Sequence, residues 1–519
     1  AVGTRGDQQP YVALGLGLQR AGYRVRLFGA ETLQRFAATQ GLQVTLAGRD
    51  WEEYGREVDA AARRPDYVPE WWEAEYHEVM KGLDFMNRGV HKWMAHQLPA
   101  AVRAVLAEMK ETKPDLLIYN HLGVNLGVAA WQHYGVRSIM AGLGTEPFSV
   151  TEGRTFGLDK FRDVDYAAVR PLLHVTPVAE MSQEAFDEHY LSSDFKLFGT
   201  SPMIKKLFTP AQLLRAKNWH YTGFWILEQD SQVQDPAMFG GKEVMQSVEA
   251  FLARRGKPVY MGWGSMTKVP SAQMLLVSIG ALKAAGLRGI VSRGWAGLSQ
   301  ELLQQVAGEA QPELCAYAEQ QVLFVDKAPH EWLFPRCACT VHHGGAGTTA
   351  ASLRAGVPTV ITPLVYDQFE HAKWVGQLGV GVGLQDFAQV EVEELAAALR
   401  RATSEREMQE RAREVQGLIM QEPGVRGAVS AISGIIREQV RSGWAKTKWE
   451  TEKRERDEAL AKWLREEKKR RAEQRVEAER SAEEALTPWA VSSEAEAGGQ
   501  AEAWPREEER RGQEEEEAR

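Results

Sequence analysis

A glycine-rich turn between a strand-like run and a helix-like run constrains the fold of this chain more than any other feature. It reads TVHHGGAGTT over Thr340–Thr349, and an alanine-rich run with helical spacing follows it. Glycines allow a close turn, and a helix starting there directs unpaired N–H groups and the positive end of its dipole at one point. The turn predicts an anion site, most often for phosphate. The alternative is a glycine-rich connection that binds nothing.

Length and composition allow two core-forming domains and further segments. The chain has 519 residues, of which 44% are hydrophobic and 26% charged, and its formal net charge is −9. One core stops growing at about 250–300 residues, so two are expected. The charge gives no indication of nucleic-acid binding. Neither a transmembrane run nor a signal peptide is visible, so we expect a cytoplasmic protein, with peripheral contact to a membrane as an alternative.

Cysteine usage is sparse. The three residues are Cys315, Cys337 and Cys339, an odd set that does not make a disulfide framework and indicates a reducing compartment. No second pair has zinc-ligand spacing, so we interpret Cys337 and Cys339 as core residues.

Strand-like and helix-like segments alternate through the first half of the chain, which predicts a doubly wound parallel sheet. A loop at 3–10 leads into a helix from Val12, and further helices (98–109, 124–134) and strands (25–28, 115–119, 137–141) follow. The opening loop–helix–strand unit implies an upstream strand. We therefore expect the natural N-terminus to lie upstream of Ala1. Residues 51–95 are rich in Trp and predict either an apolar pocket or packing between helices.

A second alternating series follows a polar segment with Pro and paired Gly at 228–242, which is typical of a linker. Its expected strands are 258–261, 289–292, 322–325, 340–342, 358–362 and 380–384, and its expected helices include 272–285, 392–401 and 405–419. We predict a domain at 1–227, a second at 243–440, and two Rossmann-like sheets facing across a cleft.

Residues 441–519 form a charged tail. The part at 446–485 is dense in Glu, Lys and Arg, which predicts a solvated helix with i,i+4 charge pairs, and the acidic end predicts disorder. Binding of a protein partner or contact with a membrane is the alternative role for this tail.

The expected strand ends of the second half gather polar side chains, and strands of such a sheet bring ligands to their carboxyl edge. These residues are Ser265, Ala328, His330, His342, His343, Asp367 and Gln368. Hydroxyl, imidazole and N–H groups suit a diphosphate, and a carboxylate beside an amide suits sugar hydroxyls. Alone, Asp367 before a helix is more typical of an N-cap.

The run VHHGGAGTTAASLRAGVPTVITPLVYDQFEHA resembles the donor-binding signature of GT-B-fold UDP-glycosyltransferases. It is most similar to the sterol 3-beta-glucosyltransferase branch and the related bacterial antibiotic glycosyltransferases. The N-terminal GTRGDQQP is similar to that branch's GxRGDVQP loop, and YTGFW, VYMGWGSM, SRGWAGL and APHEWLFPRC also match. The resemblance covers about residues 1–440 and leaves out the tail.

The resemblance implies a role for each matching residue. The diphosphate would be held by His343, Ala346, Gly347 and Thr348, with His342 adjacent and Ser265 on a phosphate. Ala328 and His330 would border the nucleobase, and Asp367 and Gln368 would bind the sugar. Thr4, Arg5 and Asp7 would form the opposite wall, with Asp7 as general base or, alternatively, as a loop cap or partner of Arg5.

The implied reaction is inverting transfer of a hexose, with glucose expected, from a UDP-sugar to a sterol or similar lipophilic hydroxyl. No Asp-x-Asp motif lies in the donor half, which fits chemistry without an obligatory metal or other cofactor. The alternatives are glycosylation of a secondary metabolite and a non-catalytic nucleotide-sugar-binding or scaffold protein. Three positions depart from the family: Gln8, Tyr366, and Thr145–Phe148 where relatives have Met-Pro-Trp.

Overall fold

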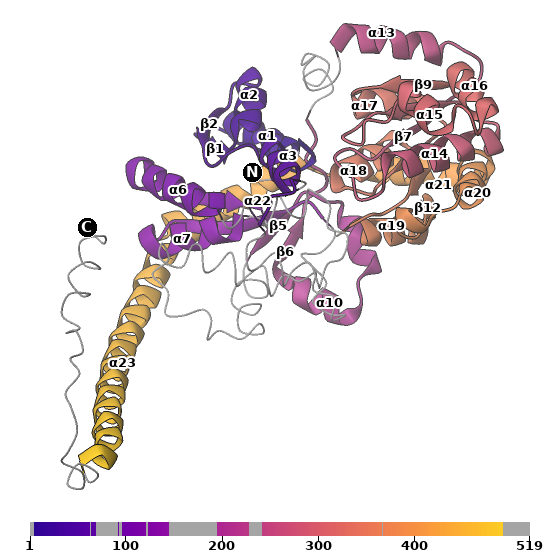
Figure 1. Cartoon of the computed structure of the whole chain (residues 1–519). Helices are drawn as coiled ribbons and strands as arrows, with labels where there is room; N and C mark the ends of the chain where they lie inside the picture. The colour runs from indigo at the N-terminus through magenta and orange to yellow at the C-terminus, as the bar shows by residue number, and fades with distance from the viewer. Residues whose placement is uncertain are drawn as a thin grey trace, which may run out of the picture. The chain divides into compact units, whose positions relative to one another are not determined.

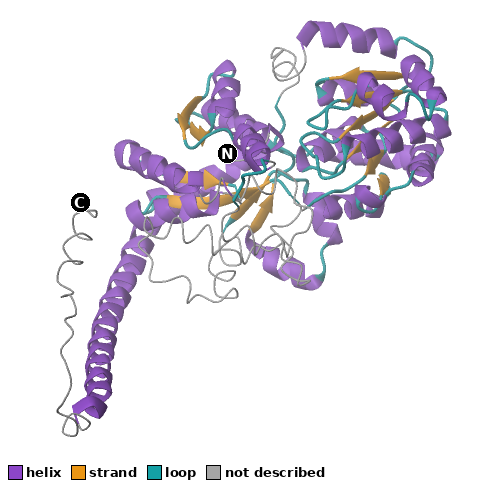
Figure 2. Ribbon diagram, viewed as in Figure 1, coloured by secondary structure: helices purple, strands orange, loops and turns teal. Residues whose placement is uncertain are grey.

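The fold is built from parallel sheets with helices on their faces. The computed structural model describes residues 5–62, 64–68, 92, 96–120, 123–144, 195–227, 241–365 and 367–490. Its strands form three sheets, of two, four and six strands, and every pairing that joins two neighbouring strands is parallel. Figures 1 and 2 trace these elements along the chain. Contacts divide the chain into two compact units, Ala1–Lys453 and Arg454–Arg519.

The first half of the larger unit holds the two smaller sheets. One pairs β1 (Arg26–Gly29) with β2 (Gln43–Leu46), and the other has the order β3-β4-β5-β6. Its strands are β3 (Leu116–Tyr119), β4 (Arg137–Gly142), β5 (Lys196–Phe198) and β6 (Trp219–Tyr221). The helices are α1 (Arg5–Arg20), α2 (Glu31–Thr39), α3 (Trp51–Ala62), α6 (Leu98–Thr112), α7 (Val124–Tyr134) and α10 (Pro210–Arg215). The predicted helices and strands of this half are confirmed within a few residues.

The start of α1 differs from the prediction. Gly6 and Pro10 indicated a loop, whereas the helix begins at Arg5 and contains Pro10. Tyr11, Val12 and Leu14 are buried in the core, and such packing overrides the local helix-breaking tendency. The backbone of Asp7 therefore belongs to the first turns of a helix.

The second half holds the six-stranded sheet, in the order β12-β11-β10-β7-β8-β9. Its strands are β7 (Val259–Gly262), β8 (Gly289–Ser292), β9 (Val322–Val325), β10 (Cys339–His342), β11 (Thr359–Ile361) and β12 (Gly381–Gly383). Its helices are α13 (Gly241–Leu252), α14 (Ser271–Ala285), α15 (Gln300–Ala307), α16 (Pro312–Gln321), α17 (His330–Leu333), α18 (Ala346–Ala355), α19 (Gln368–Gln377), α20 (Val392–Ser404) and α21 (Arg406–Ile419). All six predicted strands are confirmed.

Apolar side chains cover both faces of this sheet, because successive strand residues point to opposite sides. Val259 and Met261 join a core with α14, α15 and α20, whereas Tyr260 joins a second core with α13 and α17. Figure 2 shows the strands lying between the helices. Cys337 and Cys339 are buried free thiols in these cores, and burial raises the pKa of Cys337 to about 12. Their interpretation as core residues is confirmed.

The last helices of the larger unit return to the first half. Apolar residues of α22 (Val425–Ile435) share a buried cluster with α1, β4 and β5. A short π-helix, Ile436–Arg441, connects α22 to α23 (Trp444–Ala490). The first turns of α23 then hold α7, where Trp449 Nε1 donates to the Gln132 carbonyl at 3.2 Å and Trp131 Nε1 donates to Glu452 at 2.7 Å.

The smaller unit, taken by itself, is the rest of α23 and the segment after it. From Arg454 the helix is mostly exposed and carries ion pairs at i,i+3 and i,i+4, among them Arg471–Glu467 and Arg475–Glu479. This confirms the prediction of a solvated, charge-paired helix. Among the residues that are described, the structure has no helix of the length and apolar character needed to span a membrane.

Candidate active site

The turn after β10 makes an uncapped helix start at the carboxyl edge of the six-stranded sheet. Gly345 is the N-cap of α18, so no side chain caps the helix. Gly344 has a φ of +92°, and a β-carbon there would lie 2.7 Å from Cγ2 of Ile361, so only glycine fits. The first turn, Ala346–Thr348, is half-buried and presents N–H groups without intrahelical partners. This arrangement suits an anion.

His343 lies beside this turn. Its side chain is half-buried, and a β-carbon on Gly345 would collide with its Nε2. Burial and the charge of His371 lower the pKa of His343 to about 4, and the Gly262 carbonyl only partly opposes this shift. Nδ1 has no hydrogen-bond partner of good geometry. His343 is therefore neutral near pH 7, with one N–H to donate.

His342 plays a different part from the one expected. It is fully buried, and its Nδ1 accepts a hydrogen bond from the Gly344 N–H at 3.0 Å. Its Nε2 contacts the hydroxyls of Ser352 and Thr359 at 3.2 and 2.9 Å. Burial drives its pKa well below the usual value. The prediction that His342 lies at the diphosphate is corrected: both ring nitrogens are used by the protein, and the residue holds the turn.

Ser265 comes to the same edge from the neighbouring strand. β7 pairs with β10 so that Gly262 is opposite His342. The turns that follow these two strands therefore begin side by side at the carboxyl edge of the sheet. Gly264 has a φ of +60°, and a β-carbon there would lie 3.5 Å from Cε1 of His343. Ser265 follows it and is half-buried. The predicted proximity of the Ser265 turn to the glycine turn is therefore present in the structure.

Ala328 and His330 lie beyond β9, at the far edge of the sheet. Ala328 is buried, and His330 opens α17 with its ring stacked on Phe334, 4.4 Å between centroids. The Tyr260 hydroxyl lies 3.1 Å from Nε2 of His330. These contacts fix the plane of the His330 imidazole beside the strand ends.

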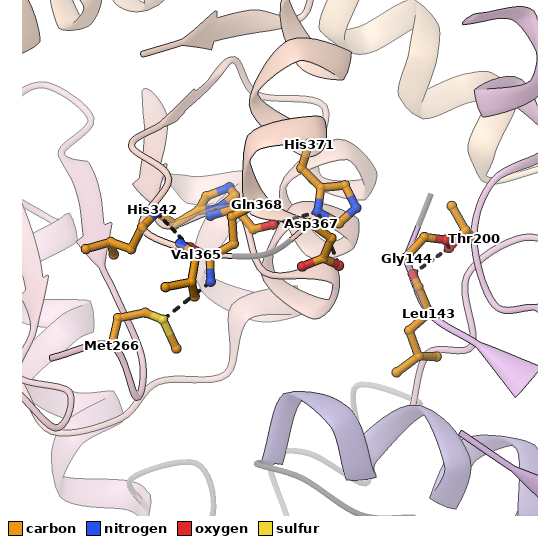
Figure 3. Close-up of polar contacts among 11 residues, drawn as sticks. Leu143, Gly144, Thr200, Met266, His342, Val365, Asp367, Gln368 and His371 are labelled. Atoms are coloured by element: carbon orange, nitrogen blue, oxygen red, sulfur yellow. Dashed lines mark hydrogen bonds and ion pairs between the residues drawn. The ribbon is translucent and has the colours of Figure 1, made fainter. Parts of the chain in front are cut away.

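Gln368 is turned inward. It is 4% exposed, and its Oε1 accepts from the N–H groups of Leu364 and Val365 at 2.9 and 3.1 Å. Its Nε2 contacts Sδ of Met266 at 3.3 Å (Figure 3). The expectation that Gln368 binds sugar hydroxyls does not match this arrangement, because its amide already braces the loop after β11. From the other side, Lys268 donates to the Leu364 carbonyl at 2.8 Å.

Asp367 keeps its carboxylate available. It is the N-cap residue of α19 but makes no side-chain capping bond, and its side chain is 40% exposed. A β-carbon on Gly144, just after β4, would lie 3.1 Å from its Oδ2. Figure 3 shows the carboxylate directed toward Gly144. Asp367 therefore lies where the two halves of the larger unit meet, and the capping alternative does not apply.

His371 is a residue that the sequence analysis missed. It is buried on α19, and its Nδ1 lies 2.7 Å from the Gly344 carbonyl and 4.0 Å from Oδ2 of Asp367 (Figure 3). One imidazole thus links the glycine turn to the exposed carboxylate. The i,i+4 spacing from Asp367, which places both on one helix face, was the available signal.

The N-terminal candidates lie at the limit of what is described. Thr4 and the side chains of Arg5 and Asp7 lie outside the described residues. The backbone beside them is placed: a β-carbon on Gly347 would lie 3.7 Å from the Gly6 carbonyl oxygen. The first turns of α1 and α18 are therefore neighbours, and Asp7 belongs to the segment that faces the glycine turn.

Other expectations fall outside the described residues. They concern Tyr366, the segment Thr145–Phe148, and most of the Trp-rich side chains of 51–95. Within the described part of the chain, no three His, Cys, Asp or Glu side chains are grouped so that they could hold a metal ion.

Comparisons with known proteins agree on one family of folds. Residues 295–432 match the family model "Erythromycin biosynthesis protein CIII-like, C-terminal domain". This range includes β10, the glycine turn, Asp367 and His371. The likeness therefore covers the second-half part of the site from β9 onward, and leaves out β7 and the turn that carries Ser265.

Two curated relatives match most of the chain. A sterol 3-beta-glucosyltransferase of Saccharomyces cerevisiae is 27% identical over 451 residues, which cover 83% of this chain and 34% of the relative. One of Arabidopsis thaliana is 27% identical over 468 residues, covering 83% of this chain and 66% of the relative. The chain thus spans about a third of the yeast relative and just under two thirds of the plant relative.

The solved structures give the architecture. The glycosyltransferase VinC in complex with dTDP has a TM-score of 0.51 at 16% sequence identity, over 84% of this chain and 97% of that chain. An identity this low establishes the fold alone. The fold is GT-B, with two Rossmann-like parallel-sheet halves, as predicted.

Proposed function

We propose that this chain, which has the GT-B fold and resembles the sterol 3-beta-glucosyltransferase branch of glycosyltransferases, transfers a hexose from a UDP-sugar to a sterol or similar lipophilic hydroxyl. Glucose is the sugar in the names of the relatives. The transfer is inverting and requires no metal or other cofactor.

The uncapped start of α18 is the observation that carries this proposal. Its N–H groups, the neutral imidazole of His343 and the hydroxyl of Ser265 lie on one edge of the sheet. Together they offer donors to a diphosphate. The charge that develops on the leaving UDP is stabilised by these groups as the bond breaks.

The chemical step is a displacement at the anomeric carbon. The acceptor oxygen forms a bond to that carbon, the bond to the β-phosphate oxygen breaks, and its electron pair leaves with UDP. The hydroxyl proton passes to a base on the opposite face. Asp7 takes this role in the proposal, because the first turn of α1 lies against the first turn of α18.

The remaining binding roles follow from placement. Asp367 accepts from sugar hydroxyls through its exposed carboxylate, while Gln368 and His371 keep that carboxylate and the glycine turn in position. His330 and Ala328 border the nucleobase, with Tyr260 fixing the His330 ring. Thr4 and Arg5 complete the wall opposite the donor.

The acceptor is proposed from the relatives' names, and the Trp-rich segment 51–95 supports an apolar one. A secondary metabolite is the second candidate, which the antibiotic-biosynthesis family model over 295–432 favours. A non-catalytic nucleotide-sugar binder is the third. The tail is proposed as a surface for a protein partner.

An acceptor panel tests the proposal. Purified protein is incubated with UDP-glucose and a series of sterols and polyphenols, and UDP release and the glycosylated product are measured. Asp7→Asn should abolish turnover while leaving UDP affinity nearly unchanged, and loss of UDP binding in that variant would falsify the base assignment. Tight UDP binding without transfer to any acceptor would favour the non-catalytic alternative.

A further inference from the structure

The segment that links β5 to β6 presents two leucines to solvent. Leu213 and Leu214, on α10, are 46% and 77% exposed. Adjacent leucines this exposed on a helix can indicate a site that contacts a membrane or a partner. We call the exposed side chains of Lys206, Leu213, Leu214 and Lys217 the α10 tip.

The tip is held rigidly. Ser201 caps the short helix Pro202–Leu207 by accepting from the Met203 N–H at 3.2 Å. Thr209 and Gln212 form a capping box at the start of α10, with N···O distances of 2.8 and 3.3 Å. The leucines are therefore displayed on a fixed turn of helix, and the side chains that flank it, such as Met203 and Trp219, are buried.

The sequence of the segment that carries the tip is basic. Residues 195–227 contain five basic residues and no acidic one, in a chain whose formal net charge is −9. The basic residues are Lys196, Lys205, Lys206, Arg215 and Lys217. Lys206 and Lys217 are exposed, whereas Lys205 turns inward and donates to the Trp219 carbonyl at 3.0 Å. Two outward lysines thus flank the two outward leucines.

We infer that the α10 tip docks onto the surface of an anionic lipid membrane. A stable protein interface needs roughly 1,000 Å² or more of buried surface, and two leucines with two lysines supply only a small part of that. A membrane needs no such area: apolar side chains enter the boundary of the acyl chains, while each lysine near an anionic leaflet adds about fivefold in affinity. Two adjacent exposed leucines between two exposed lysines in the sequence match that chemistry.

Docking there would bring the first half of the chain to the lipid that holds its acceptor. The β5 end carries Thr200, whose hydroxyl contacts the carbonyls of Leu143 and Gly144 at 2.5 and 2.9 Å (Figure 3). Gly144 in turn lies beside Asp367. This part of the inference, delivery of the acceptor, rests on the proposed function, whereas membrane binding itself does not.

The test measures vesicle binding by the full chain. Sedimentation with phosphatidylcholine vesicles, with and without phosphatidylserine, is compared for wild type, a Leu213→Ser/Leu214→Ser variant and a Lys206→Gln/Lys217→Gln variant. The leucine variant should lose at least about tenfold in affinity for the anionic vesicles, and the lysine variant should also lose part of the salt dependence. Leu418→Ser and Lys110→Gln, exposed on α21 and α6, serve as matched controls and should bind like wild type.

Two outcomes overturn the inference. One is vesicle binding by the leucine variant that equals wild type, which would place the membrane contact elsewhere, such as on the charged tail. The other is no binding of wild type to either vesicle, which would leave a protein partner as the occupant of the tip.

An assay of transfer to a sterol in two forms tests this inference and the proposed function separately. The leucine variant should act normally on a detergent-dissolved sterol and slowly on a sterol embedded in anionic vesicles. If no acceptor is glycosylated by wild type while tip-dependent vesicle binding persists, the proposed function fails and the docking surface stands.

Discussion

Gly144 lies so close to Asp367 that a β-carbon on it would be 3.1 Å from the carboxylate Oδ2. The first residue follows β4 in one half of the chain and the second opens α19 in the other. A β-carbon at this distance requires the carboxylate to move by a few tenths of an ångström, which is sufficient to misplace the group that we propose binds the sugar.

Gly144→Ala should therefore lower kcat with the UDP-sugar several-fold while leaving the affinity for UDP alone unchanged. Gly376→Ala on α19 is the matched control, since a β-carbon there meets nothing within 4 Å. Steady-state kinetics and UDP titration measure both. If the kcat of Gly144→Ala equals that of wild type, the exact position of the Asp367 carboxylate is not critical for transfer.

The adjacent histidines should separate into a binding residue and a structural one. His343→Ala removes a donor at the glycine turn, so UDP should bind roughly tenfold to a hundredfold more weakly with little change in Tm. His342→Ala leaves the Gly344 N–H without its acceptor, at a cost of about 1–3 kcal/mol. It also removes one contact each from the buried hydroxyls of Ser352 and Thr359, which keep their contacts with the Thr340 hydroxyl. Its Tm should fall by several degrees. Equal Tm values for the two variants would contradict this division.

Gln368 offers a matched pair of substitutions. Gln368→Leu removes the acceptor for the Leu364 and Val365 N–H groups and should lower the Tm. Gln368→Glu keeps that acceptor, but it replaces the contact with Met266 by a buried carboxyl group, so its Tm should be closer to wild type at about pH 5 than at about pH 8. Thermal unfolding of both distinguishes a brace from a sugar ligand. If the two variants are equally stable and both raise the KM for the UDP-sugar, Gln368 contacts the sugar.

Glu422 should make stability depend on pH. Burial raises its pKa to about 7, partly opposed by a hydrogen bond from Ser201, while the unfolded carboxyl has a pKa of 4.5. The folded state then holds a proton that the unfolded state has lost. The favourable contribution of Glu422 is therefore fully present below the unfolded pKa and is lost as the pH rises through about 7.

Glu422→Gln should accordingly raise the Tm at about pH 8 and change it little at about pH 5. Scanning calorimetry at both values checks this. A Tm difference of the same size at the two pH values would mean that ionisation of Glu422 is not the cause. Glu414→Gln on α21, at an exposed ion pair, is the control and should show no such pH dependence.

The strands and helices were largely predictable because their signals are local. The run 289–292 has the residue pattern of a strand, and the run 124–134 has that of a helix. The structure has a strand and a helix at those residues. The place of the anion turn was also predictable, since Gly344 and Gly345 stand between a strand pattern and a helix pattern. Such features depend on neighbours in sequence and need no knowledge of distant contacts.

The direction of individual side chains was not predictable in the same way. His342 and His343 are consecutive, yet the strand alternation buries the first and leaves the second beside the turn. Gln368 points inward because its Oε1 accepts from the Leu364 N–H in the preceding loop and its Nε2 contacts Met266, which lies far from it in the sequence. His371 connects to the Gly344 carbonyl only through the fold. Roles decided by such distant partners require the structure.

The return of α22 to the first half also sets an order for folding. The face of the first-half sheet that includes Ile139 and Leu197 is covered by Ile432 and Ile435, which lie more than two hundred residues later in the chain. During synthesis that apolar face stays open until α22 has left the ribosome, so the half that is made first is completed last. A fragment ending at the linker would carry the same open face, and adding the segment from α22 onward as a separate peptide is the way to close it.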